Sequence, residues 1–218
     1  MMRDFVVAVG EISKYFTIGI LILFIASWKK IPVTMRPMFW LFVVSVVCYS
    51  LSPIATKIYH NNLFIGSAFF VGQFALLYYV LTREMKESSW ARILLIGYLS
   101  FFLINFIFIQ GPLVVNSYSR NMGALIMIGL CLINLHRLLT DHATPIFNSP
   151  MFWVILGTLI FNAGTFFVFM ITNYFRSGGI LFDILWSIHN TLNLIKTVLF
   201  TVAIWQSYRY QRMNFSTS

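Results

Sequence analysis

The sequence predicts an all-α fold in which seven transmembrane helices form one polytopic membrane domain. Of the 218 residues, 59% are hydrophobic and only 10% are charged, and the apolar residues fall into seven separate runs. A spanning helix needs roughly 20 mostly apolar residues, because the hydrocarbon core of a bilayer is about 30 Å thick. Each run meets this length, and none shows the in-and-out alternation of a lipid-facing barrel strand.

We expect these helices at about residues 5–28, 38–59, 63–82, 91–110, 121–139, 151–174 and 180–207. The first run is not a cleaved signal peptide on this interpretation, because Glu11 and Lys14 interrupt its apolar stretch and residues 25–30 make a poor cleavage site. The gaps between the runs hold at most about a dozen residues, whereas a folded domain needs at least about 50. Residues 1–218 are therefore expected to form a single seven-helix domain.

The basic residues indicate which way the helices cross the membrane. Those that follow the first, third, fifth and seventh helices are Lys29, Lys30, Arg36, Arg83, Lys86, Arg92, Arg137, Arg209 and Arg212, and the opposite ends carry Arg3, Lys57, Arg120 and Arg176. Lys and Arg in short loops stay on the cytoplasmic side. We therefore expect the N-terminus outside and the C-terminus inside, in a multi-pass protein of a bacterial inner membrane. The net charge of +9 is then a topology signal, with the lipid bilayer as partner and no nucleic acid.

The sequence contains no pattern that is typical of an enzyme, a metal site or a cofactor site. Cys48 and Cys131 lie in the middle of helices, and the four histidines are scattered without ligand spacing. The chain lacks a Gly-rich phosphate loop and a nucleophile motif, and Glu11 and Asp183 are the only acids near the bilayer. We expect no catalytic residue, no metal and no cofactor.

Charged residues inside a membrane are costly, so each must find a partner or water in the bundle interior. Glu11 and Lys14 lie three residues apart on the first helix and can pair. Asp183 lies near the outer end of the seventh helix. Lys196 lies near the middle of the same helix, roughly 14 Å from its inner end at 1.5 Å per residue, which is too deep for easy snorkelling. We expect Lys196 to face the interior and to contact polar atoms.

The seventh helix carries a polar stripe in steps of three and four, formed by Trp186, Asn190, Asn193, Lys196 and Thr197. If the first and seventh helices are neighbours, their outer thirds share a polar pocket. The candidate ligand-binding residues are Glu11, Lys14, Asp183, Trp186, His189 and Asn190, and the candidate relay residues are Asn193 and Lys196. The alternative is structural, with Asn and Thr holding the helices together and with stabilising ion pairs such as Glu11 with Lys14.

Several motifs resemble the seven-helix sensor modules at the N-terminus of bacterial sensor histidine kinases. They are Pro150-Met151-Phe152-Trp153, Asn162, Asn173-Tyr174 and Leu185-Trp186-x-x-His189-x-x-x-Asn193. The resemblance implies that the membrane part senses an input and passes it on, with those roles at Trp186, His189 and Asn193. The sequence departs from that family by stopping after Ser218 without a phosphoacceptor or ATP-binding region, so a stand-alone receptor-like module is expected.

We therefore expect a sensory or signalling protein that detects an outer-side or membrane small-molecule ligand and signals through a cytoplasmic or membrane partner protein. The alternative is a small seven-helix transporter of a small solute. Below Lys196 the polar stripe fades into Leu199, Phe200 and Val202, and this favours a one-sided receptor pocket over a path that reaches both faces.

Overall fold

The computed structural model describes residues 2–31, 33–83, 89–140, 145–172 and 179–215. These residues form seven long helices, which are α1 (Met2–Ala26), α2 (Arg36–Tyr59), α3 (Leu63–Thr82), α4 (Ser89–Ile104), α5 (Ser117–Thr140), α6 (Pro150–Thr172) and α7 (Ile180–Phe215). A π-helical turn, Asn105–Ile109, continues α4, and 3-10 helices occupy Trp28–Lys30, Val33–Met35 and Ile146–Asn148. The described residues contain no strand, which confirms the predicted all-α class.

Two helix boundaries differ from the prediction in a way that affects the site. The fifth helix begins at Ser117 instead of about residue 121, and the seventh continues to Phe215 instead of ending near residue 207. The early start of α5 has a local cause, because the Gln110 side chain accepts a hydrogen bond from the Tyr118 backbone N–H at 3.1 Å. Such a bond satisfies one of the first-turn N–H groups that a helix leaves open. The predicted end of the sixth helix, at Tyr174, lies outside the described residues.

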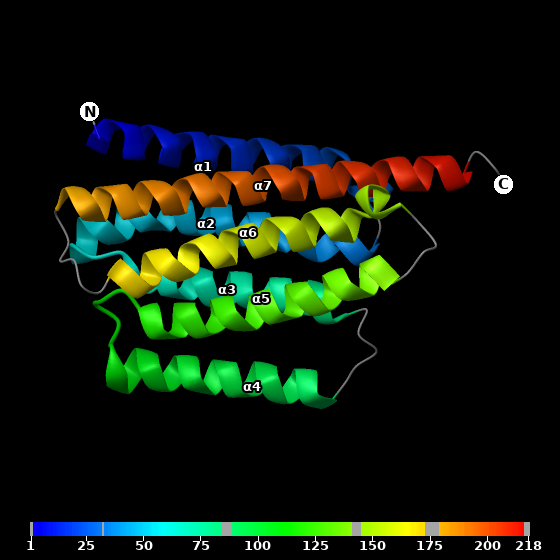
Figure 1. Ribbon diagram of the computed structural model, residues 1–218. Helices are drawn as coiled ribbons and strands as arrows, with labels where there is room; N and C mark the ends of the chain where they lie inside the picture. Colours follow the sequence, from blue (N-terminus) through cyan, green and yellow to red (C-terminus); the bar gives the residue numbers. More distant parts are fainter. Residues whose placement is uncertain (1, 32, 84–88, 141–144, 173–178, 216–218) are drawn as a thin grey trace.

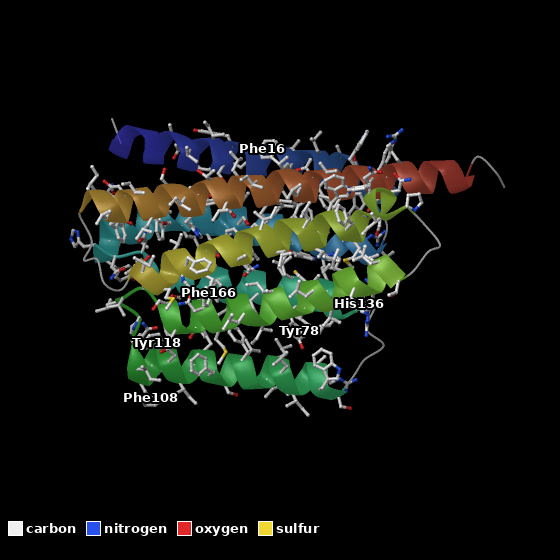
Figure 2. All side chains as sticks on the ribbon, in the orientation of Figure 1. Phe16, Tyr78, Phe108, Tyr118, His136 and Phe166 are labelled. Carbon is white, nitrogen blue, oxygen red and sulfur yellow. The ribbon has the colours of Figure 1, made fainter. Side chains whose placement is uncertain are left out.

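Six of the helices, α1 to α6, are long and apolar enough to cross a membrane, with the π-helical turn counted as part of α4. Large hydrophobic side chains cover the outside of the bundle, and Figure 2 shows Phe108, which is 79% exposed, pointing away from it. Such a surface suits a lipid environment, so the chain is a multi-pass membrane protein. The polar stripe lowers the hydropathy of α7, and this helix is not among the six.

Six helices close into a ring around a common interior. Around this ring α1 packs against α2, α2 against α3, α3 against α5, α5 against α6, α6 against α7, and α7 against α1. The fourth helix lies outside the ring, against α3 and α5, at one edge of the bundle (Figure 1). The predicted contact between the first and seventh helices is therefore confirmed, and α7 takes part in the ring in spite of its polar residues.

The two ends of the bundle have different interiors. We call the end where α1, α3, α5 and α7 begin the N-terminal end, and the end where α2, α4 and α6 begin the C-terminal end (Figure 1). The apolar core fills the C-terminal half, with members such as Phe24, Met38, Leu81, Val154 and Phe200. Most buried polar and charged side chains lie instead toward the N-terminal end, among them Ser13, Ser67, Gln73, Asn116, Arg120, Asn162, Ser187 and Asn193. The larger group of buried polar side chains among the described residues is therefore in the N-terminal half.

Candidate functional site

Lys196 of α7 points into the interior of the helix ring and is buried, with 2% of its surface exposed. This confirms the predicted orientation. Its Nζ lies 3.8 Å from the centroid of the Phe161 ring of α6, and within the described part of the chain it makes no hydrogen bond or ion pair. The partner is thus the face of an aromatic ring and not the polar atoms that we expected. A cation held over a ring away from water gains about 2 kcal/mol or more.

His189 lies on the same side of α7, between two aromatic rings of α6. Its ring centroid is 5.5 Å from that of Phe161 and 5.3 Å from that of Phe169. Trp186 covers a third side at 5.3 Å. The Nδ1 atom of His189 is buried and has no hydrogen-bond partner in the described residues. The imidazole is therefore fixed by packing, while one of its polar atoms remains available.

Arg120 of α5 is a buried cation that the sequence reasoning missed. Its guanidinium carbon lies 4.6 Å from the Phe169 centroid and 5.6 Å from the Phe70 centroid, and 7% of the residue is exposed. Its Nε is buried without a partner. Gly66 leaves room for this side chain, because a Cβ there would lie 3.2 Å from a terminal guanidinium nitrogen. From the sequence, Arg120 was expected at the outer end, just before a helix that begins near residue 121.

These side chains form a row in which positive or polar groups alternate with rings. The order is Arg120, Phe169, His189, Phe161 and Lys196, and we call it the cation row. The described residues provide no carboxylate within ion-pair distance of Arg120 or Lys196. An unpaired charge at the centre of a membrane costs at least about 2.5 kcal/mol. The faces of the aromatic rings offset part of this cost. The cation row still keeps a net positive charge.

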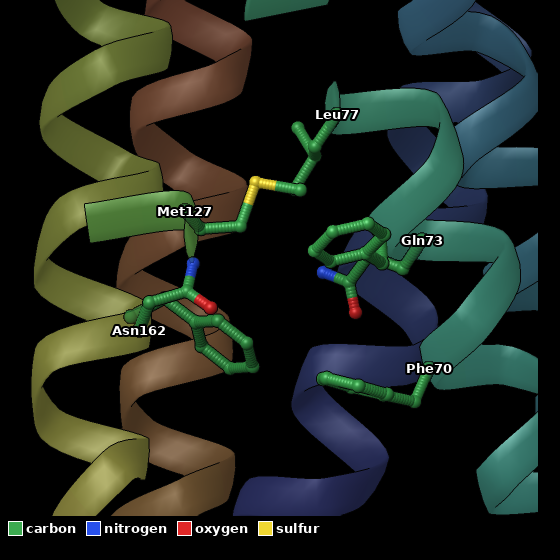
Figure 3. A pocket seen from close by; sticks show the side chains of 7 residues that line it. Phe70, Gln73, Leu77, Met127 and Asn162 are labelled. Carbon is green, nitrogen blue, oxygen red and sulfur yellow. The ribbon is translucent and has the colours of Figure 1, made fainter. Parts of the chain in front are cut away.

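A small cavity lies beside the cation row, between α3, α5 and α6. It is lined by Phe70, Gln73, Phe74, Leu77, Met127, Phe161 and Asn162, and it has room for about one water molecule. Figure 3 shows Gln73 and Phe70 reaching into it from α3, opposite Met127 and Asn162. The Gln73 Nε2 is buried without a hydrogen-bond partner, and Asn162 Nδ2 donates to the Thr158 carbonyl at 2.8 Å. Two of the lining rings, Phe70 and Phe161, carry the cations of the row.

Asn193 joins three helices at the same level of the bundle. Its Nδ2 donates to the Ser13 hydroxyl of α1 at 3.1 Å and to the Tyr49 hydroxyl of α2 at 2.9 Å. Asn190 also faces α1, because a Cβ on Gly10 would lie 3.6 Å from its Nδ2. These two amides therefore hold α7 to α1, whereas His189 and Lys196 face α6.

The structure does not bring all the predicted ligand-binding residues together. Glu11 and Lys14 pair with each other at 3.5 Å, with 51% and 31% of their side chains exposed, on the outer side of α1 away from its buried Ser13. Asp183 is half-buried in the first turn of α7 and makes no ion pair in the described residues. Trp186 stacks on Phe182, with centroids 5.9 Å apart, and contacts His189. The compact part of the site is the cation row with its cavity.

No family model, no curated protein and no solved structure matches this chain. A functional interpretation of the site therefore rests on its own geometry and chemistry.

Proposed function

We propose that this chain is a non-enzymatic membrane sensor. It recognises a small ligand at the cation row, from the N-terminal end of the bundle, and passes the signal to a partner protein at the C-terminal end. The observation that carries this proposal is a pair of buried cations, Arg120 and Lys196, without a carboxylate partner among the described residues, in a bundle whose apolar core lies in the other half.

A purely structural role explains the cation row poorly. Replacing buried charged groups by apolar residues of similar volume is often neutral or stabilising, so stability alone does not favour two unpaired cations in a core. Charged residues inside membranes usually mark ligand, ion or proton sites. The free Nδ1 of His189 and Nε of Arg120 add polar atoms that a ligand can satisfy.

The apolar C-terminal half supports sensing over transport. On α7, Phe200 and Ala203 follow Lys196 and are fully buried. Phe42 of α2, Leu81 of α3 and Val154 of α6 belong to the same apolar core. A transported solute needs a path to both sides of the membrane, and the apolar side chains packed below the cation row do not favour such a path.

The seventh helix is suited to carry the signal. It is a continuous helix of 36 residues, about 54 Å long, and it extends past the other helices at the C-terminal end (Figure 1). His189 and Lys196 place the ligand contacts on this helix, and Asn193 couples it to α1 and α2. A shift of α7 at the cation row would therefore move its far end, where a partner can bind.

The proposed location is a bacterial inner membrane, with α7 as a seventh span, the N-terminus outside and the C-terminus inside. The beginning of α1 and the end of α7 lie at opposite ends of the bundle (Figure 1), which supports an odd number of crossings. The basic residues Lys29, Arg36, Arg83, Arg92, Arg137 and Arg209 all lie at or near the C-terminal end, as expected for the cytoplasmic side.

The test compares transcripts in three strains with those in wild-type cells. One strain lacks the gene, one carries His189→Ala and one carries Ile188→Ala. Ile188→Ala is the matched control, because Ile188 is the neighbouring residue on α7 and is exposed on the outside of the bundle. Protein levels are equalised by immunoblot. We expect His189→Ala to reproduce most of the transcript changes of the deletion and Ile188→Ala to cause none. Unchanged transcripts in the deletion strain, together with altered accumulation of a solute, would support transport and contradict sensing.

A further inference from the structure

We infer that the cavity between α3, α5 and α6 binds one small monovalent inorganic anion of the halide class. The inference rests on the proposed function for the role of this anion as the sensed ligand. The binding itself follows from the charge around the cavity, from an unpartnered donor in its lining and from its size.

Charge is the first reason. Arg120 and Lys196 place two positive charges inside the ring of six helices, and the described residues supply no ion-pair partner for either. Buried charges are retained in proteins when they are paired or when they contact an ion. Aromatic faces lower the energy of a cation without neutralising it. A bound anion would complement both charges.

The lining of the cavity offers the groups that an anion needs. Two of the lining rings carry cations. The Lys196 Nζ lies 3.8 Å from the centroid of Phe161, and the Arg120 guanidinium carbon lies 5.6 Å from the centroid of Phe70. Gln73 adds a conventional donor, because its Nε2 has no acceptor and the residue is only 5% exposed. No carboxylate is among the residues that line this space.

The size of the cavity selects among anions. It has room for about one water molecule, so it suits a monatomic ion and is too small for a phosphate or a dicarboxylate. Phe70, Phe74 and Met127 line it with apolar groups. A single water molecule also fits this space and is the neutral alternative that the experiment must distinguish.

The experiment measures thermal unfolding of the purified full chain in zwitterionic nanodiscs. Sodium bromide is compared with sodium gluconate at constant ionic strength. We expect the melting temperature to rise by about 3 to 6 °C at a bromide concentration ten times the dissociation constant, and the effect to saturate. Lys196→Met should lose this rise, whereas Lys14→Met, which removes a partly exposed lysine from the same half of the bundle, should keep it.

Gln73→Glu gives the sharpest comparison, because it places a carboxylate of nearly the same shape in the cavity. If the cavity holds an anion, this carboxylate replaces it. The variant should then melt in gluconate near the temperature of the wild-type protein in bromide, and it should no longer respond to bromide. If the cavity holds only water, a buried carboxylate lowers the melting temperature.

Two results would overturn the inference. One is an equal melting temperature of the wild-type protein in bromide and in gluconate. The other is a bromide response that Gln73→Glu and Lys196→Met leave unchanged, since this would locate the effect elsewhere. Either result leaves the transcript test of His189→Ala to decide on sensing. A bromide response in the purified protein with no transcript change in cells would support the anion site and contradict the sensing role.

Discussion

The contact between Lys196 and the Phe161 ring can be measured directly. Phe161 is buried, and its ring centroid lies 3.8 Å from the Lys196 Nζ. Phe161→Leu keeps an apolar side chain but removes the ring. A desolvated cation–ring contact contributes about 2 kcal/mol, and the lost side-chain volume costs a further amount of about 1 kcal/mol. We expect Phe161→Leu to destabilise the wild-type protein by about 3 kcal/mol.

A double-mutant cycle with Lys196→Met separates the two contributions. In the Lys196→Met background the cation is absent, so Phe161→Leu should cost only about 1 kcal/mol. For a protein of this length 1 kcal/mol corresponds to about 2 to 4 °C. The melting temperature should therefore fall by about 6 to 12 °C in the wild-type background and by about 2 to 4 °C in the methionine background.

The assay uses circular dichroism to follow the thermal unfolding of the wild-type protein, the two single variants and the double variant in one detergent. Phe169→Leu is the matched control, because the Phe169 ring contacts Arg120 and His189, whereas Lys196 lies over the Phe161 ring. Its cost should be the same in both backgrounds. An equal cost of Phe161→Leu with and without Lys196 would refute the reasoning, since it would mean that the ring stabilises the protein by packing alone.

Three further predictions concern packing, hydrogen bonding and topology. Gly123→Ala should destabilise the protein by about 1 to 3 kcal/mol in a chemical unfolding assay, because the new Cβ would lie 2.9 Å from atoms of two aromatic rings. On the same helix Gly129→Ala has nothing within 4 Å and should be neutral or stabilising; equal losses in the two variants would contradict this account of the packing. Asn193→Ala should cost about 1 to 2 kcal/mol, more than Tyr49→Phe, since it removes two interhelical hydrogen bonds and not one, and the reverse order would refute the bridging role. Alkaline phosphatase fused after Ser218 should be inactive in cells, and an active fusion would reverse the proposed orientation.

Much of the fold could be predicted from the sequence because a bilayer imposes a length on every apolar run. The predicted ranges 38–59 and 63–82 closely match α2, at 36–59, and α3, at 63–82. The helical class follows from the continuity of the runs. The boundary of α5 could not be predicted in this way. Its first turn is polar, and it becomes helical because side chains such as Gln110 satisfy its backbone N–H groups. That turn holds Arg120, so the second buried cation was missed together with the boundary.

Within the candidate site, the sequence alone determined which residues of α7 are unusual. Periodicity places Lys196 and Asn193 on a stripe, and the cost of a buried charge turns Lys196 inward. Periodicity is a property of one helix and contains no information about the partners of that helix. Only the tertiary structure decided that Lys196 lies over Phe161, that Arg120 approaches the same row from α5, and that Glu11 and Lys14 lie on the outer side of α1. The physical reason is that long-range contacts depend on how the six helices of the ring rotate and pack against one another, and no single hydrophobic run records that arrangement.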